Sequence, residues 1–306
     1  MYPLTLLLAL LLDAALGEPR ALWSRWPHPV VLMGRAIGWC DARFNRGAAR
    51  KAKGAAVIAV LSGAAIILGL VIRAIPDFGL LEVLLGAVLL AQRSLTDHVH
   101  AVADGLRRSL ADGRRAVARI VGRDTDEMGV PEVARGAIES AAENFSDGVI
   151  APAFWFLLFG LPGILFYKLV NTADSMIGHR TPRHEQFGWA AARLDDVLNL
   201  IPARLTALLI ALTNGWYDAS PILRDAPRHR SPNAGWPEAA LAPALDVALS
   251  GPRSYHGRKT DFPWVWPEGR RDIGADEIDE AVGALWRAWW GLLAALVALA
   301  IMALAV

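Results

Sequence analysis

The sequence has a single cysteine, Cys40, among its 306 residues. One thiol excludes an intramolecular disulfide framework and cannot supply a cysteine-based zinc site. Charged residues are also scarce, at 20%, whereas 54% of the residues are hydrophobic; both values depart from those of ordinary soluble domains. The net charge is +1, and no basic stripe with stacking aromatic residues occurs, so we expect no nucleic-acid partner. Long apolar runs instead indicate an integral membrane protein.

Common nucleotide-binding and nucleophile motifs are absent as well. The sequence contains no P-loop, no Gly-x-Gly-x-x-Gly turn opening a βαβ unit and no Gly-x-Ser-x-Gly elbow. These absences argue against the usual nucleotide-binding folds and against α/β-hydrolase chemistry. Any phosphate chemistry must therefore rest on acids, arginines and loop glycines.

Four apolar segments predict membrane-spanning helices. Because no Lys or Arg precedes residues 4–16 and Asp13 interrupts them, we interpret this segment as an uncleaved helix rather than a signal peptide. Residues 55–75 and 79–92 form an apolar hairpin. Residues 285–306 form the last helix, with tryptophans suited to the interface. The predicted fold class is all-α: a polytopic integral membrane protein with about four spanning helices.

The stretch between these helices predicts a less regular structure. Residues 149–170 have spanning length, but Pro152 and Gly160–Gly163 break them into two short pieces. Residues 197–213 are likewise interrupted by proline and arginine. Irregular backbone at membrane depth is tolerated where it lines a protein cavity. We therefore expect residues 149–213 to form broken or re-entrant helices around a site on the cytoplasmic face.

Basic residues predict the orientation. The loop that follows the first helix, up to Gly54, carries eight Lys or Arg residues, and the positive-inside rule places it in the cytoplasm. The polar segments 93–148 and 214–284 are expected on the same side, within a single membrane-embedded domain covering residues 1–306. The predicted location is the cytoplasmic (inner) cell membrane, with several passes through the lipid bilayer.

One group of acids lies on a predicted helix. Glu139, Glu143 and Asp147 recur every four residues and share one face, with Gly148 as a plausible helix end. Neighbouring carboxylates repel each other; a divalent cation would relieve this repulsion, and hard oxygen ligands suit Mg²⁺. The alternative is a solvated face on which Arg135 pairs with Glu139. For this helix alone, the solvated face is the simpler interpretation.

A second polar group makes the metal site the better interpretation than the solvated face. Asn171, Asp174, Asp195 and Asp196 adjoin apolar segments, and Asn144 lies beside the first group. Polar groups beside membrane segments are expensive to keep and mark functional sites. Carboxylates that hold a metal, together with arginines that bind phosphate oxygens bidentately, fit an enzyme that handles a phosphorylated substrate through Mg²⁺.

Nine short strings are spread over nearly the whole chain. They are Leu12-Asp13…Gly17-Glu18-Pro19, His28-Pro29-Val30, Arg93-Ser94-Leu95, Glu139-Ser140…Glu143-Asn144-Phe145-Ser146-Asp147-Gly148, Asn171-Thr172…Asp174-Ser175-Met176, Arg193-Leu194-Asp195-Asp196, Asn199…Pro202-Ala203-Arg204, Ser231-Pro232-Asn233-Ala234-Gly235-Trp236-Pro237 and Gly251-Pro252-Arg253-Ser254-Tyr255. Together and in this order they resemble the cobalamin-biosynthesis adenosylcobinamide-phosphate synthase family. Only the region from Arg258 to Asp279 has no pattern that we can match.

The resemblance implies an activity. Members of that family are integral to the cytoplasmic membrane and join adenosylcobyric acid to aminopropanol phosphate, or to threonine phosphate in some versions, as an amide with ATP. ATP, Mg²⁺ and these two substrates are thus expected here, as is contact with other late cobalamin-pathway enzymes. A carboxylate oxygen is a poor leaving group, so the acid is most economically activated as an acyl phosphate through a phosphoryl transfer.

The resemblance and this chemistry together assign roles to the candidate residues. The catalytic candidates are Glu139, Glu143, Asp174, Asp195 and His229; the metal candidates are Glu143, Asp147, Asp174, Asp195 and Asp196; the substrate- and phosphate-binding candidates are Asn144, Asn171, Arg193, Arg230, Asn233, Arg253 and Tyr255. The amine must be neutral to attack, so a general base is useful, and His28, His98 and His229 are the candidates. We expect the two acidic groups to converge at the cytosolic rim of the bilayer around a magnesium-bound nucleotide.

Two rival functions share parts of this pattern. A membrane prenyl-type transferase also uses paired acidic motifs and Mg²⁺, but it needs a hydrophobic tunnel and no ATP. A non-catalytic membrane sensor or transport component would bind a corrinoid without turnover and would tolerate acid-to-amide changes.

Overall fold

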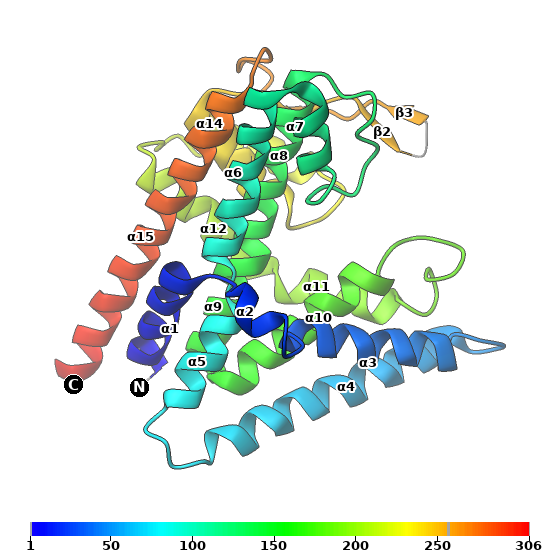
Figure 1. Cartoon of the computed structure of the whole chain (residues 1–306), viewed down its shortest axis with the longest axis vertical. Coiled ribbons are helices and arrows are strands. Elements are labelled where there is room, and N and C mark those ends of the chain that lie inside the picture. The colour runs from blue at the N-terminus through cyan, green and yellow to red at the C-terminus, as the bar shows by residue number, and fades with distance from the viewer. Residues whose placement is uncertain (1, 256–257, 306) are drawn as a thin grey trace. The chain divides into compact units, whose positions relative to one another are not determined.

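A computed structural model describes residues 2–255 and 258–305. The fold is mostly helical, with two small two-stranded sheets (Figure 1). The chain divides into two compact units: unit 1 comprises Met1–Arg93, Asp147–Leu200 and Leu296–Val306, and unit 2 comprises Ser94–Ser146 and Ile201–Ala295. The single domain over residues 1–306 stays a prediction, as does the cytoplasmic location of the polar segments 93–148 and 214–284. Both segments fall almost entirely within unit 2.

Unit 1 is a set of helices packed around α10. Its elements are α1 (Tyr2–Leu16), α2 (Arg20–Trp23), α3 (Pro29–Phe44), α4 (Arg50–Arg73), α5 (Leu80–Leu89), most of a π-helix (Ser146–Ile150), α9 (Ala151–Phe159), α10 (Leu161–Ile177) and α11 (Trp189–Leu198). Helix α10 packs against α3, α4, α9 and α11, and α1 packs against α5. The buried rings of Tyr167 and Phe156 fill the interior of this unit.

The predicted break within residues 149–170 is confirmed at Gly160. Helix α9 ends one residue before Gly160 and α10 begins one residue after it. Gly160 has φ +67°, and a Cβ there would lie 2.5 Å from a ring carbon of Tyr2, so this junction requires glycine. Pro152, in contrast, does not break the helix. It lies in the first turn of α9, which follows the π-helix without a gap, so the helical backbone continues through the proline.

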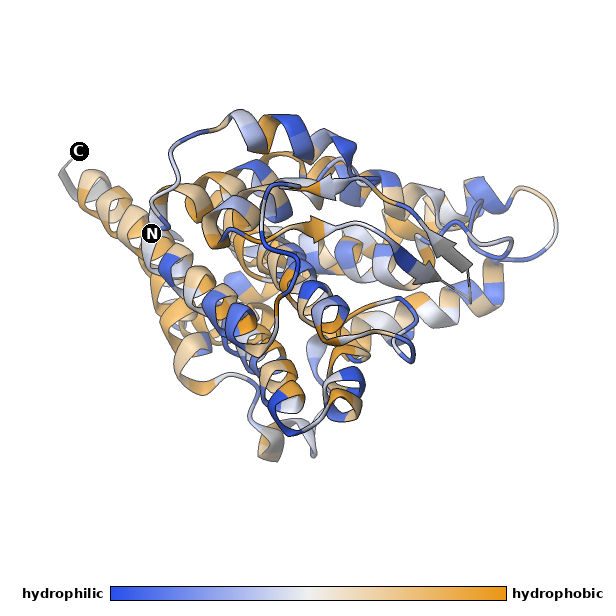
Figure 2. Ribbon diagram, turned by 90° about the horizontal axis from the view of Figure 1, so that it is seen from above, coloured by the Kyte–Doolittle hydropathy of each residue, from blue (hydrophilic) through white to orange (hydrophobic). Residues whose placement is uncertain are grey.

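Among the residues that the structure describes, two helices are long and apolar enough to cross a membrane: α4, and α15 (Ala275–Ala305) over Ala275–Met302. The pair α11 and α12 (Leu200–Thr213), bent at the break between them, adds a third candidate if it is one broken span. Helices α1 and α5 are shorter, with 15 and 10 residues, so a fourth span stays a prediction. Figure 2 shows the apolar character of α15 toward the C-terminus. These helices mark the chain as a membrane protein.

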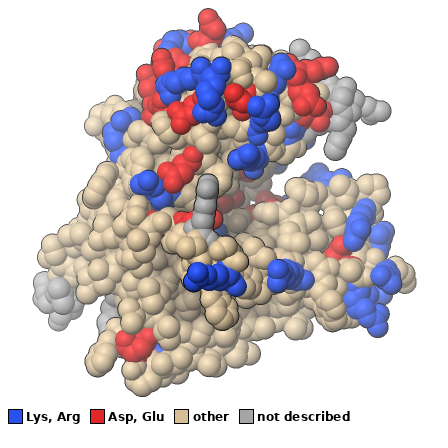
Figure 3. Space-filling model, viewed as in Figure 1, with Lys and Arg blue, Asp and Glu red and all other residues tan. Residues whose placement is uncertain are grey.

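The surfaces of unit 1 and unit 2 differ in how many charged side chains they expose. In unit 1 large apolar side chains of α4, among them Val60, Ile67 and Val71, are exposed, and beyond the basic first turn of α4 this face carries few charges (Figure 3). In unit 2 acidic and basic side chains are interspersed over α6 (Gln92–Arg108) and α7 (Leu110–Val117), where Arg108 and Arg115 both pair with Asp112. The apolar face of α4 is suited to lipid, and the mixed charges of α6 and α7 are suited to water.

Unit 2 is built around α8 (Val130–Phe145). Pro131 occupies its first turn as expected. The predicted end at Gly148 is wrong, because α8 runs directly into the π-helix, where the backbone bonding changes from i+4 to i+5. Helix α8 packs against α7, α14 (Gly235–Leu245) and strand β1 (Leu249–Ser250). The unit also contains most of α6 and α15, and α12, α13 (Ser220–Asp225) and a 3₁₀ turn (Ala226–Arg228).

Four short strands make the fold depart from a strictly all-α class. Strand β1 pairs antiparallel with β4 (Trp264–Val265), and β2 (Arg253–Tyr255) pairs antiparallel with β3 (Arg258–Thr260). Strands of two or three residues show no alternation that a sequence pattern could detect. Their effect is local but important: β1 and β4 bring residues from the C-terminal part of unit 2 against α8.

Candidate functional site

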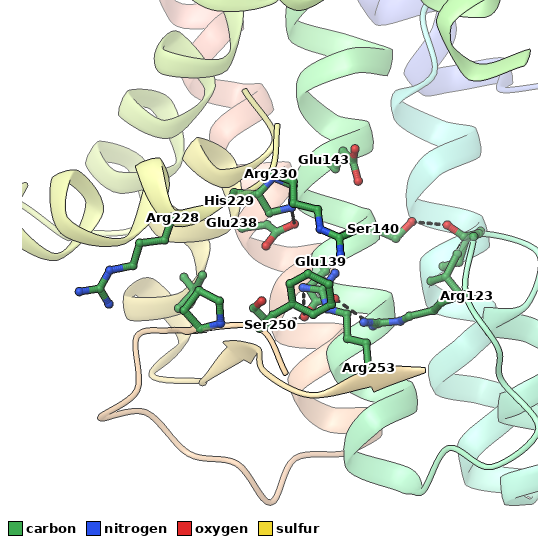
Figure 4. A pocket seen from close by; sticks show the side chains of 17 residues that line it. Arg123, Glu139, Ser140, Glu143, Arg228, His229, Arg230, Glu238, Ser250 and Arg253 are labelled. Carbon is green, nitrogen blue, oxygen red and sulfur yellow. Dashed lines mark hydrogen bonds and ion pairs between the residues drawn. The ribbon is translucent and has the colours of Figure 1, made fainter. Parts of the chain in front are cut away.

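A pocket of about 270 Å³ opens on α8 within unit 2 (Figure 4). Its walls come from five segments distant in sequence: residues 120–123, α8, the loop 228–230, α14, and residues 250–265. This volume is near the low end for small-ligand sites. The pocket is therefore large enough for a phosphate-bearing group but too small to enclose a whole corrinoid.

Glu139 is the centre of the pocket's charge network. Its carboxylate is only 4% exposed. Oε2 accepts a hydrogen bond from Arg123 Nη2 at 2.9 Å, and Oε1 accepts one from the backbone N–H of Ser250 at 2.6 Å. Arg253 Nη2 lies 3.3 Å from Oε1. Both oxygens are thus engaged by donors, so Glu139 holds two arginines in place and is poorly suited to ligate a metal.

A glycine makes this approach feasible. A Cβ on Gly136 would lie 2.7 Å from Arg123 Nη2, so the guanidinium reaches Glu139 across a position that carries no side chain. Arg123 comes from the segment before α8, 16 residues from its partner. Gly136 lies one turn from Glu139 on α8. Because Gly136 has no side chain, the loop residue Arg123 can reach the carboxylate of Glu139 across it.

Arg253 shares one aromatic ring with a third arginine, Arg230. The guanidinium carbon of Arg230 lies 4.4 Å from the centre of the Phe262 ring, and that of Arg253 lies 5.5 Å from it. Stacked guanidinium groups keep their in-plane N–H donors available. Together with Arg123 they give the pocket a strongly positive wall that suits phosphate oxygens.

His229 and Glu238 also line the pocket, close to Arg230 (Figure 4). The backbone N–H of Ser231 donates to His229 Nδ1 at 3.0 Å. His229 Nε2 lies 3.9 Å from Oε1 of Glu238, which is only 2% exposed. Burial, followed by the positive charge of Arg253, lowers the pKa of His229. Burial, followed by the negative charge of Glu139, raises the pKa of Glu238 well above its usual value.

A second pocket, of about 660 Å³, adjoins the same two arginines. Arg123 and Arg253 line both pockets, and the second is completed by residues 124–135, Pro252, Ser254 and Trp264. Arg135, which is 6% exposed, stacks on the Trp264 ring at 4.7 Å. The alternative interpretation, a solvated face on which Arg135 pairs with Glu139, does not hold, because Glu139 is buried and Arg123 and Arg253 pair with its carboxylate.

The second acidic group lies in unit 1. Asp195 is buried and accepts hydrogen bonds from Asn171 Nδ2 at 3.2 Å and from Asn199 Nδ2 at 3.0 Å. Asn199 in turn accepts from the hydroxyl of Tyr167 at 2.9 Å. Asp174 lies near enough to interact electrostatically with Asp195. These residues form one polar network among apolar helices.

The predicted residues thus fall into two sets. In unit 2, Glu139, Glu143, His229, Arg230 and Arg253 line one pocket. In unit 1, Asn171 and Asp195 are hydrogen-bonded, and Arg193 pairs with Asp196 at 3.1 Å. The convergence of the two acidic groups stays a prediction, since they belong to different units. Within the described ranges, no group of three or more His, Cys, Asp or Glu side chains is arranged to hold a metal ion.

The remaining predicted residues have local roles or lie elsewhere. Asn144 donates to the carbonyl oxygen of Ser140 one turn earlier on α8. Asn233 accepts from Arg204 at 3.4 Å. The carbonyl oxygen of Asp147 accepts from a buried tyrosine hydroxyl. Tyr255 belongs to β2, but its side chain lies outside the described residues.

Among the three histidines predicted as bases, His229 alone lines the pocket. His28 caps α3: its Nδ1 accepts from the N–H of Val30, and its Nε2 lies 3.1 Å from the carbonyl oxygen of Val88. His98 is exposed on α6 and bonds the carbonyl oxygen of Ser94. Both contacts are structural.

Sequence reasoning missed Arg123, Ser250 and Glu238 as parts of the site. Ser250 contributes only its backbone N–H, which no side-chain pattern signals. Glu238 lies in the first turn of an alanine-rich helix, where an acid is also expected to complement the helix dipole. The signal available for Glu238 was its place at the start of a helix with almost no other polar residue.

The chain resembles known proteins over nearly its whole length. The model of the family described as CobD/Cbib protein matches residues 6–285. Proteins named "Cobalamin biosynthesis protein CobD" are similar to it: that of Sinorhizobium fredii is 50% identical with 95% of each chain covered, that of Rhizobium meliloti is 51% identical with 93% of each covered, and that of Rhodobacter capsulatus is 48% identical with 85% of each covered. No solved structure matches. The chain belongs to the CobD/Cbib protein family.

Proposed function

We propose that this chain is an amide-forming synthase of cobalamin biosynthesis. It would join adenosylcobyric acid to (R)-1-aminopropan-2-yl phosphate, or to threonine phosphate, with ATP hydrolysis, giving adenosylcobinamide phosphate. The observation that carries the proposal is the pocket of unit 2, where Arg123, Arg230 and Arg253 surround two buried carboxyl groups. The name of the similar proteins, which refers to cobalamin biosynthesis, supports the pathway.

The two adjoining pockets fit a reaction with two phosphate-bearing substrates. ATP and the amine substrate each carry phosphate, and the two pockets share Arg123 and Arg253. Guanidinium groups bind phosphate oxygens through paired N–H donors. The two pockets together are too small to enclose the corrinoid. Its carboxylate side chain would therefore reach the pockets from the surface.

The chemistry needs an activated acid. The γ-phosphoryl group of ATP passes to the corrinoid carboxylate, ADP leaves, and the amine displaces phosphate from the acyl phosphate to form the amide. Arg230 and Arg253 would neutralise charge on the transferred group, which is the main requirement of phosphoryl transfer. Arg123 would support Arg253 through their common partner, Glu139.

Magnesium is part of the proposal. Mg²⁺ commonly binds through one or two carboxylates together with substrate phosphates, and when bound it neutralises phosphate charge. Glu143, at the exposed edge of the pocket, fits such a role better than Glu139, whose oxygens are already engaged. Asp147, Asp174, Asp195 and Asp196 stay proposed ligands in unit 1.

We place the protein in the cytoplasmic membrane with several passes and the site on the cytosolic side. Cysteine labelling in cells tests this arrangement. Cys40 is buried and would be replaced by alanine. Ser146 is also buried, so Glu132 is the better reporter on α8, and Ser175 is exposed on α10. Cysteines at 132 and 175 should both react from the cytosolic side; labelling from opposite sides would refute the shared face.

The activity is tested with purified full-length protein, adenosylcobyric acid, ATP, Mg²⁺ and each amine phosphate in turn, followed by mass analysis. We expect adenosylcobinamide phosphate with one ADP and one phosphate per amide. Arg253→Met should lower the rate, whereas Arg271→Met serves as the matched control, because Arg271 is exposed, stacks on the Trp264 ring and lines neither pocket. Product without ATP would favour a transferase of another class, and corrinoid binding without turnover would favour a sensor.

A further inference from the structure

Glu238 is a buried acid with an unused oxygen in the arginine pocket. It projects from α14, is 2% exposed and lines the pocket beside His229 (Figure 4). Within the described part of the chain, its Oε2 has no hydrogen-bond partner although it is shielded from solvent. A buried carboxyl oxygen without a partner costs free energy, so this position calls for a ligand that donates a proton or a hydrogen bond.

His229 is poorly placed to accept a proton. Its Nδ1 lone pair already receives the backbone N–H of Ser231. In the neutral ring the proton must therefore be on Nε2, the nitrogen that points toward Glu238. A neutral His229 thus offers an N–H donor to the pocket and no lone pair.

From this geometry we infer that Glu238, not His229, is the general base that removes the proton from the amine substrate, and that His229 is a positioning residue. The inference rests on the proposed function. A carboxylate with two oxygens can face Nε2 of His229 with Oε1 and the substrate ammonium with Oε2. A buried carboxylate is also a stronger base than an exposed one, because burial disfavours its charged form.

The charges around Glu238 support the assignment. The groups that act on it are Glu139 and Glu143 from α8, Arg123 from the preceding segment, Arg253 from β2 and His229 from the loop before α14. The two acids and burial raise the pKa of Glu238, while the two arginines oppose that rise without cancelling it. An ammonium group entering the pocket would find its counter-charge in ionised Glu238, because the carboxylate of Glu139 is already paired with Arg123 and Arg253.

Amide formation from the ammonium and the acyl phosphate requires the loss of two protons from the nitrogen. One proton passes from the ammonium to Glu238 Oε2, and the freed nitrogen lone pair forms a bond to the carbonyl carbon of the acyl phosphate. The bond from that carbon to the phosphate oxygen breaks, and phosphate leaves with the electron pair. The second nitrogen proton passes to the departing phosphate, and Glu238 returns its proton to water. Overall, carboxylate, ammonium and ATP give amide, ADP, phosphate and one proton.

Hydroxylamine separates the base from the rest of the reaction. It is uncharged near neutral pH and attacks acyl phosphates without deprotonation by the enzyme. Full-length wild type and Glu238→Gln would be compared in two assays: amide formation with aminopropanol phosphate, and corrinoid hydroxamate formation with hydroxylamine and ATP. We expect Glu238→Gln to lose about 100-fold or more in amide formation and to keep hydroxamate formation within about threefold, a typical spread for an unaffected step. Glu280→Gln, on the exposed side of α15, should change neither rate.

Each other outcome is informative. An equal loss in both assays, or no loss of amide formation, would overturn the assignment, as would a larger loss with His229→Gln than with Glu238→Gln. If Glu238→Gln does not fold, Glu238→Asp replaces it: the ratio of amide to hydroxamate should rise with pH in wild type, and its midpoint should shift in Glu238→Asp. An unchanged midpoint would overturn the inference. Hydroxamate formation that is absent from wild type would refute the proposed function itself.

Discussion

Replacing Glu139 by glutamine tests how strongly the pocket is held together. Its Oε2 faces Arg123 and its Oε1 faces the N–H of Ser250 and Arg253. Glutamine has one oxygen and one NH₂ group of nearly the same shape. Whichever way the amide is turned, its NH₂ group meets donors, so at least one charge-assisted hydrogen bond is lost and a guanidinium stays buried without its counter-charge.

The expected cost follows from burial. The side chains of Arg123 and Glu139 are 7% and 6% exposed. Removing one partner of a buried ion pair typically costs about 3–5 kcal/mol, whereas an exposed pair contributes about 0–1 kcal/mol. At about 1.4 kcal/mol per factor of ten, the equilibrium for local opening should increase about 100- to 4,000-fold.

Amide hydrogen exchange measures this opening in the intact protein. Exchange should accelerate in peptides that contain α8 and β1 in Glu139→Gln, and amide formation should fall with it. The matched control is Asp276→Asn, which removes an ion pair to Arg107 of similar length, 2.8 Å, at an exposed site where Arg107 keeps its pair with Asp279; no measurable acceleration is expected there. Acceleration below about fivefold in Glu139→Gln, equivalent to about 1 kcal/mol, would refute the argument that this pair organises the pocket.

Three further predictions concern the same chain. Gly136→Ala should displace the Arg123 guanidinium, since its Cβ would lie 2.7 Å from Nη2; the weakened buried pair with Glu139 should outweigh the gain of about 1 kcal/mol that alanine has over glycine in a helix, for a net loss of about 1–3 kcal/mol. Hydrogen exchange in α8 measures it, and an unchanged rate would contradict it. Asp195→Asn should lower amide formation at least about tenfold, because both carboxylate oxygens receive amide donors; normal activity in membranes would remove Asp195 from the proposed site. Burial alone would raise the pKa of Asp225. Hydrogen bonds from Arg224 and the N–H of Trp266 lower it by more, so the pKa of Asp225 lies below its usual value. Its ionised form therefore stabilises the fold above pH 3.8, the usual value, and this contribution disappears as the pH falls through the lowered pKa; Asp225→Asn should show a smaller acid dependence of exchange in residues 220–230, and an equal dependence would contradict this.

The sequence predicts local features of this fold better than long-range ones. The break at Gly160, the apolar helix α4 and the start of α8 at Pro131 follow from glycine, hydropathy and proline, which act over one or two turns. The sequence did not predict the end of α8. Gly148 looks the same in the sequence whether it ends a helix or lies in a π-helix, as it does here after Phe145.

The site shows the same division. Glu139 and Glu143 were identified because spacing along one helix places them on one face. Arg123 and Glu238 were not, since their positions depend on how a loop and α14 pack against α8. In the alternative interpretation Arg135 pairs with Glu139 at i−4 spacing, yet Arg123 pairs with it instead, because Gly136 leaves room for the guanidinium. A contact between a loop arginine and α8 depends on tertiary packing, which spacing along one helix does not predict.

Arg123 and Arg253 border both pockets of unit 2, and this arrangement makes the two occupants thermodynamically linked. An anion bound in one pocket neutralises part of the positive charge of Arg123 and Arg253, and so lowers the positive potential in the other pocket. Under the proposed function, two phosphate-bearing ligands in these pockets should weaken each other's affinity without overlapping, and by the same factor in both directions. A cation that accompanies one of them should reduce this antagonism.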